Sequence, residues 1–165
     1  MTKTLSRLES SAPLQLPDEI WSALSLAYSS PPRAYHSIDH VAEVADRFNQ
    51  VADGPGWRDP HEIFLAILFH DAIYSPGRRD NETESARVAR ALLERWHRHP
   101  RLDIDRVETL ILATARHGSL TDKDVDPEMA LFLDCDMAIL GSSPERFDWY
   151  DLAIADEYSP VLPKE

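Results

Sequence analysis

Hydrophobic residues recur along most of the chain at the three- and four-residue spacing of amphipathic helices. Runs that alternate between apolar and polar residues, as half-buried strands do, are not found. The pattern therefore predicts an all-α fold, a compact bundle of about seven helices. Six of these carry an apolar stripe and span residues 18–28, 37–52, 81–97, 103–117, 127–140 and 144–158.

The seventh predicted helix differs because it is apolar on every side. Seven apolar residues from Ile63 run directly into His70 and Asp71. Such a run belongs to a buried helix, which we place from Pro60 to about Tyr74. Its end brings an imidazole and a carboxylate next to the core, where an ionised carboxylate needs a partner or a cation. A satisfied core histidine followed by a solvated aspartate is the simplest alternative.

The ends of the chain look different from its centre. Residues 1–16 are polar and mixed, and we interpret them as a flexible lead-in. Residues 17–160 form the helical domain, and residues 161–165 form a C-terminal tail. The length of 165 residues fits one domain with a core of useful size.

Charge and composition restrict the class of protein. The formal net charge of −12 argues against a nucleic acid polymer as partner, because such proteins need a basic surface. The single cysteine, Cys135, excludes an internal disulfide and fits a reducing compartment. No signal-peptide pattern and no apolar run of membrane-spanning length are found. We therefore expect a cytoplasmic protein without a membrane partner.

One aspartate stands where an apolar residue is expected. Asp136 lies in the apolar stripe of its helix, between Leu133 and Ile139, whereas Asp134 points further round. A carboxylate in that position needs a partner. The partner is either an arginine or helix N-terminus, or a metal ion, and the sequence leaves both readings open.

Three histidines also lie near apolar faces. His40 flanks the stripe of its helix, and His36 lies one turn before it, a spacing common in metal pairs. His117 extends the apolar face of its own helix. Each histidine taken alone is more often a packed or solvated residue than a ligand. The remaining histidines are interpreted as surface residues: His61, His97 and His99.

Taken together, these side chains form a candidate metal site. Two nitrogen and two oxygen ligands come from His40, His70, Asp71 and Asp136. This mixture suits a divalent transition metal such as Mn, Fe, Co, Ni or Zn, with Mg as a further candidate, and does not suit Ca. Four protein ligands leave places on the ion for water and substrate. Whether one or two ions bind stays open.

An ordered series of short motifs resembles a known family. The matching stretches are Tyr35-His36, His40-Val41, Phe69-His70-Asp71-Ala72-Ile73-Tyr74, Asn81-Glu82, Ser85-Ala86, Ala113-Thr114, His117, Leu133-Asp134-Cys135-Asp136, Ile139-Leu140-Gly141 and Glu157-Tyr158. They cover about residues 33–158. The series is similar to the HD-domain superfamily of metal-dependent phosphohydrolases, and within it to the predicted HD phosphohydrolases of the bacterial cytoplasm.

The resemblance implies an all-helical domain that holds a divalent metal through His40, His70, Asp71 and Asp136. It also implies hydrolysis of a phosphate ester, a nucleotide or a related small phosphorylated metabolite, and leaves a homodimer open. Relatives are expected to continue with one or two further helices. The tail at residues 161–165 is therefore read as truncated relative to the family.

Further residues are candidates for catalysis and substrate binding. Asp71 and His117 are expected to act in catalysis, and Glu82 is expected to orient water or transfer a proton. The alternative for Glu82 is a carboxylate favoured at a helix N-terminus. The candidates for substrate binding are His36, Arg78 and Arg79. Both arginines can fork onto phosphate oxygens, although solvated loop charges are the simpler reading.

Two other classes of function compete with the hydrolase. A di-iron oxygenase of HD type would need additional ligands from His36, His117 or Asp134. A non-catalytic helical module would hold metal and nucleotide without hydrolysing the ester. Metal stoichiometry and a test of turnover discriminate among the three.

Overall fold

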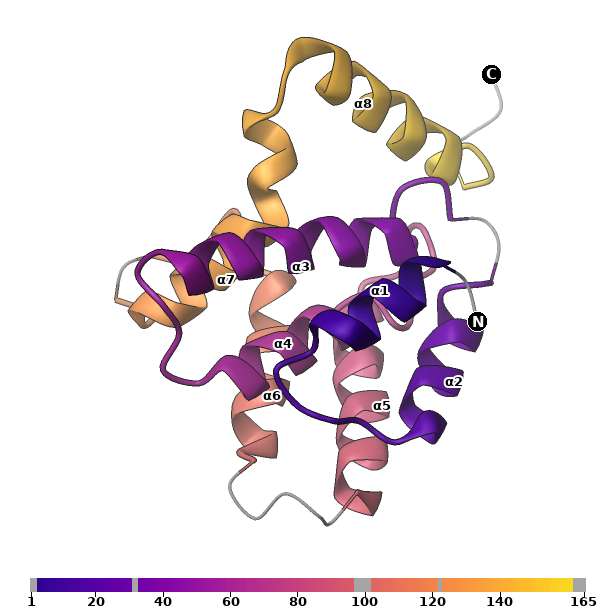
Figure 1. Ribbon diagram of the computed structural model, residues 1–165. Helices are drawn as coiled ribbons and strands as arrows, with labels where there is room; N and C mark the ends of the chain where they lie inside the picture. Colours follow the sequence, from indigo (N-terminus) through magenta and orange to yellow (C-terminus); the bar gives the residue numbers. More distant parts are fainter. Residues whose placement is uncertain (1–2, 31–32, 97–101, 122, 162–165) are drawn as a thin grey trace.

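The computed structural model describes residues 3–30, 33–96, 102–121 and 123–161 (Figure 1). Within these residues the fold is all-α, as predicted, and contains no strand. The elements are α1 Lys3–Ser11, α2 Asp18–Ala27, α3 Ile38–Asp53, α4 Pro60–Phe69, α5 Asn81–Arg95, α6 Ile104–Thr114, α7 Pro127–Asp136, the 3-10 helix η1 Met137–Gly141, and α8 Pro144–Tyr158.

Helix α4 lies at the centre of the core. From Ile63 to Phe69 no residue is more than 1% exposed, and α4 contacts α3, α5, α6 and α7. Pro60 stands in its first turn, where the missing N–H costs no helical hydrogen bond. The all-round apolar run therefore has the buried position that its composition predicts.

The end of α4 differs from the prediction, because the helix stops at Phe69 and does not reach Tyr74. Side chains from elsewhere take the carbonyl groups at this end. The Tyr28 hydroxyl donates to the Leu68 carbonyl at 3.1 Å. The Arg33 guanidinium donates to the carbonyls of Asp71 and Ala72 at 2.8 and 3.1 Å. These bonds replace the helical ones, so the chain can leave the helix just after His70.

The other helix ends follow local rules. The side chains of Asp103, Asp126 and Ser143 accept backbone N–H groups at the starts of α6, α7 and α8. Helix α6 ends at Thr114, three residues before the predicted end, and α7 tightens into η1 at Asp136. The predicted end of α5 at residue 97 lies outside the described part of the chain.

The prediction of a flexible lead-in is wrong for the part of residues 1–16 that is described. Residues Lys3–Ser11 form α1, whose Leu5 and Leu8 are each only 1% exposed. This helix packs on α2 and α3, and Leu14 and Leu16 are also buried. Four leucines thus attach the segment to the core. Of the predicted tail, only Val161 is described.

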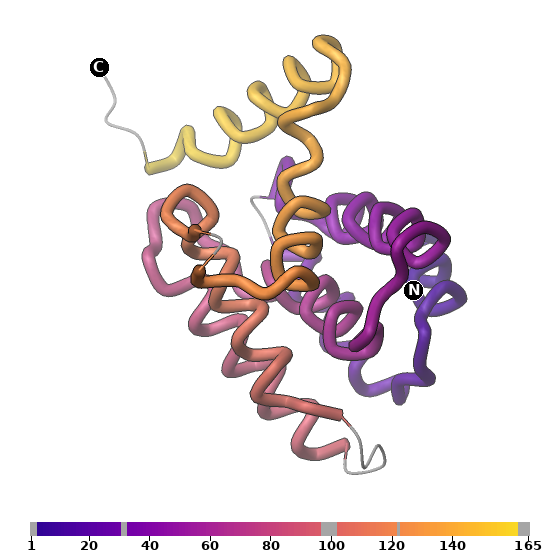
Figure 2. The backbone as a smooth tube through the Cα atoms, turned by 90° about the vertical axis from the view of Figure 1, so that its left-hand side faces the viewer, coloured from indigo at the N-terminus to yellow at the C-terminus, as the bar shows by residue number. Residues whose placement is uncertain are grey.

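Helix α8 lies across one end of the molecule, outside the bundle of the other helices, in both views (Figures 1 and 2). It follows η1, and only Ala153 and Glu157 are buried along its length. Within the residues described, no helix is both long enough and apolar enough to cross a membrane.

Candidate metal centre

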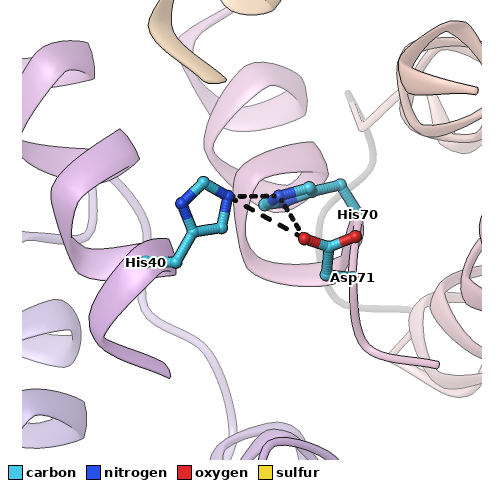
Figure 3. Close-up of side chains that lie close together, drawn as sticks. All are labelled: His40, His70 and Asp71. Atoms are coloured by element: carbon cyan, nitrogen blue, oxygen red, sulfur yellow. Dashed lines mark hydrogen bonds and ion pairs between the residues drawn. The ribbon is translucent and has the colours of Figure 1, made fainter. Parts of the chain in front are cut away.

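Three predicted ligands meet at the end of α4 (Figure 3). Nε2 of His70 lies 3.3 Å from Nε2 of His40 and 3.1 Å from Oδ2 of Asp71. Nε2 of His40 lies 3.8 Å from the same Asp71 oxygen. His40 comes from the first turn of α3, and its side chain and that of His70 are almost fully buried. These three residues form a group that could hold a metal ion.

The fourth predicted ligand lies beside this group. Asp136 is the last residue of α7, and its Oδ1 lies 3.0 Å from His40 Nε2 and 3.4 Å from His70 Nε2. Two ligand atoms bound to one ion at about 2.1 Å are about 3.0 Å apart at 90° and about 3.4 Å apart at 109°. The distances from His70 to His40, Asp71 and Asp136, and from His40 to Asp136, match these values, and the group of mutually close ligand atoms consists of His40, His70 and Asp71.

A backbone contact orients the imidazole of His70. Its Nδ1 lies 2.9 Å from the Ile67 carbonyl oxygen, which can only accept a hydrogen bond. Nδ1 therefore carries a proton, and Nε2 faces His40 and the carboxylates. A histidine held in this way presents a defined nitrogen to a metal, as is common for metal-binding histidines.

The carboxylates of Asp71 and Asp136 create a negative electrostatic potential at the centre of the cluster. Burial lowers the pKa of His70, but the carboxylates of Asp71 and Asp136 outweigh burial and raise that pKa well above its ordinary value. Burial opposes ionisation of both aspartates as well. The neighbouring histidines overcome it, lowering the pKa of Asp71 to about 2 and that of Asp136 well below its usual range. The arrangement favours a cation at its centre.

An open pocket of about 380 Å³ leads to the cluster. His117 lines it and its Nε2 is 2.9 Å from Oδ2 of Asp136, on the carboxylate oxygen that does not face His40. Glu82 also lines the pocket, and its side chain makes no hydrogen bond or ion pair within the described residues. A free carboxylate is thus available beside the candidate metal position.

The loop before Glu82 is fixed by specific turn and side-chain contacts. Gly77 has φ of 81° in a turn closed by the hydrogen bond from Arg78 N to Ser75 O, a conformation that favours glycine. Asn81 exchanges two hydrogen bonds with the backbone of Ser75, and Ser85 does the same with Ile73. These hydrogen bonds fix the start of α5 beside the pocket.

The candidate substrate-binding residues are placed unequally. Arg78 lines the pocket, but its guanidinium forks onto Asp80 with both contacts at 2.8 Å. Arg79 is exposed and is not among the described residues that line the pocket. His36 lines it, and its Nδ1 donates to Glu157 at 2.6 Å.

The extra ligands that a di-iron site would need are mostly engaged elsewhere. Asp134 is exposed and lines a different hollow, with Arg47 and Pro55. His36 is held by Glu157, which leaves only His117 next to the cluster. Of the predicted surface histidines, His61 is partly buried in the first turn of α4, and residues 97 and 99 lie outside the described ranges.

Sequence reasoning missed two residues that hold the site together. Arg33 joins the turn after α4 to the segment before α3, since it also donates to the His36 carbonyl at 3.0 Å. Glu157 is fully buried and accepts from the backbone N–H groups of Tyr35 and His36 at 2.8 and 2.9 Å. Glu157 lies four residues after Ala153 and three after Ile154, on the same face of the helix. A carboxylate on an apolar face was a usable signal. Arg33 had none.

Comparison of the chain with family models, curated proteins and solved structures finds no match. The chemistry of the site therefore rests on the donor set itself. Two imidazole nitrogens and the neighbouring carboxylates can bind a divalent ion, and the pocket gives a small molecule access to it.

Proposed function

We propose that the protein is a metal-dependent phosphohydrolase of HD-domain type that cleaves a phosphate ester of a nucleotide or a related small metabolite in the cytoplasm. The observation that carries the proposal is the convergence of His40, His70 and Asp71, with Asp136 beside them, at the end of an open pocket. Burying ionisable groups costs free energy, and clusters of buried carboxylates and imidazoles at a pocket are typical of functional sites.

The proposed roles follow from the contacts. A bound divalent ion would polarise the phosphoryl oxygen and make a water molecule more acidic. His40, His70, Asp71 and Asp136 would hold the ion. The hydrogen bond from His117 orients the Asp136 carboxylate, so that Oδ1 stays directed at the two imidazoles.

Residues of the loop and of α5 would act on the reacting groups. Glu82 accepts a proton from the attacking water or orients that water, because its carboxylate is unengaged and lines the pocket. Arg78 would exchange its contact with Asp80 for two phosphoryl oxygens. Its position at the pocket supports this role, whereas that of Arg79 gives no support.

The test is reconstitution followed by a substrate screen. Metal-free protein is loaded with Mn, Fe, Co, Ni, Zn or Mg separately and assayed for phosphate release from a panel of phosphate esters. We expect turnover that depends on metal and is lost in Asp71→Asn, which controls for a contaminating phosphatase. Folded protein that binds metal in the cluster but hydrolyses no ester would refute the proposal and favour a binding module.

A further inference from the structure

Aromatic side chains make up much of the pocket lining outside the metal cluster. Tyr150, Ile154 and Tyr158 are spaced four residues apart on α8 and all line the pocket. This spacing puts them on one face of the helix. The exposed Leu152 lies between them in sequence but is 71% exposed, so α8 turns one defined face toward the pocket.

Rings from two other segments complete this lining. Tyr74 stacks on His36 with ring centroids 3.9 Å apart, and Tyr74 also interacts with Tyr158. Tyr35 meets Tyr150 edge to face at 4.7 Å. The fixed rings present flat apolar surface and phenolic hydroxyls, which suit a planar group that can stack and accept hydrogen bonds.

Positive charge is scarce in the same pocket. Among the described residues that line it there is no lysine, and Arg78 is the one arginine. Asp71 and Asp136 would neutralise a divalent ion, and Glu82 offsets Arg78. A single phosphoryl group can be held by the ion itself. Each further phosphoryl group would add negative charge that no lysine or second arginine among the described lining residues faces.

We infer that the pocket selects an ester of a single phosphate whose alcohol carries a flat aromatic group, and that it discriminates against polyphosphates. The inference rests on the proposed function and specifies its substrate. In the reaction, the oxygen of water bonds to phosphorus and the P–O bond to the alcohol breaks. The alcohol leaves with a proton, and inorganic phosphate is the second product.

The aromatic part is tested by binding, independently of turnover. Calorimetry on the Mn-loaded protein compares phenylphosphonate with methylphosphonate, whose C–P bonds are not ester bonds and stay intact. We expect phenylphosphonate to bind about tenfold more tightly. Tyr150→Leu should remove most of this preference, and Leu152→Ala, on the exposed face of α8, should keep it. Equal affinity of the two phosphonates for the unaltered protein would overturn the inference.

The charge part is tested with adenosine mono-, di- and triphosphate in excess Mg. We expect kcat/KM, or affinity where nothing is hydrolysed, to be at least about tenfold higher for the monophosphate. A preference for the triphosphate would overturn the inference while leaving the hydrolase intact. Preference for phenylphosphonate and for the monophosphate, without hydrolysis of any ester, would support the selectivity and refute the proposed hydrolase.

Discussion

Helices α4 and α8 contribute to the same site from opposite structural situations. From Ile63 to Phe69, α4 is at most 1% exposed and is surrounded by four other helices. Helix α8 is longer, yet it buries only Ala153 and Glu157, and it exposes Phe147, Trp149 and Leu152 by 38%, 43% and 71%.

The difference separates two tasks. Ligands that must keep distances within tenths of an ångström stand at the end of the most buried helix, where packing fixes the backbone. The side chains proposed to face the substrate stand on a helix with few core contacts, where local opening costs least free energy.

The metal site at the end of α4 should lose Mn binding completely when the carboxylate of Asp136 is removed. Asp136→Ala should abolish Mn binding at concentrations that saturate the unaltered protein, because Oδ1 of Asp136 lies within 3.4 Å of both imidazoles. Asp134→Ala is the matched control, since this residue is exposed two positions away. Calorimetric Mn titration measures both variants. A greater loss of Mn affinity in Asp134→Ala than in Asp136→Ala would show that Asp136 is not the metal ligand.

Glu82→Gln should lower turnover by roughly 10²–10⁴-fold, the contribution of a general acid or base, with Mn affinity unchanged. The amide has nearly the same shape but cannot take a proton. Glu84→Gln, in the same turn of α5 and paired with Arg87, should keep full turnover. The measurement is kcat on whichever ester the screen finds. Normal turnover in Glu82→Gln would remove this carboxylate from the mechanism.

Matched truncations of leucine test the packing contrast directly. Leu65→Ala in α4 should lower the free energy of unfolding by about 2–5 kcal/mol, because a fully buried side chain leaves a cavity. Leu152→Ala in α8 should change it by no more than about 0.5 kcal/mol. Urea denaturation gives both values. Similar losses in the two variants would show that α8 is covered in solution.

Metal should stabilise the protein through the α4 side. At 100 times its dissociation constant, Mn should add about 2.7 kcal/mol of stability. For a chain of this size the melting temperature should rise by roughly 5–11 °C. Thermal melts should show a higher melting temperature after Mn is added and a return to the original value after excess chelator is added. An unchanged midpoint, in protein shown to be metal-free at the start, would count against the site.

The smallest effect concerns Glu157, which attaches α8 to the segment before α3. Burial raises its pKa, but the hydrogen bonds from His36 and the backbone outweigh burial and lower it below 4.5. Its contribution is therefore present above pH 4.5 and lost as pH falls through the folded-state pKa. Glu157→Gln should cost about 1–2 kcal/mol at neutral pH, and less in acid.

Thermal melts at several pH values check this behaviour. Asp156→Asn, an exposed neighbour on the same helix, is the control and should show no comparable loss. A cost that stays constant from neutral to acidic pH would mean that the charge of Glu157 does not contribute.

Local pattern was sufficient for much of the fold. The apolar stripes, the caps at Asp103 and Asp126, and the unusual position of Asp136 all depend on residues close in sequence. What escaped prediction depends on contacts between distant residues. Helix α1 is held by Leu5 and Leu8, whose burial comes from packing on α2 and α3.

The site shows the same division. His40, His70, Asp71 and Asp136 could be named from their apolar surroundings, and the structure brings them together. The early end of α4 could not be predicted, because Arg33, 38 residues away from Asp71, takes a carbonyl at that end. A side chain that bonds to a remote backbone leaves no periodic signal in the sequence.

The link between Glu157 and Tyr35 joins residues 122 positions apart, and the contact between His40 and Asp136 spans 96. Contacts of such long sequence separation form late, because closing a large loop costs chain entropy before any bond compensates for it. During synthesis, α4 can be complete while the α7 carboxylate and the α8 anchor are still inside the ribosome. Metal capture is therefore expected to follow the emergence of α7, and a nascent chain that has exposed only α1 to α4 cannot yet hold the ion with Asp136.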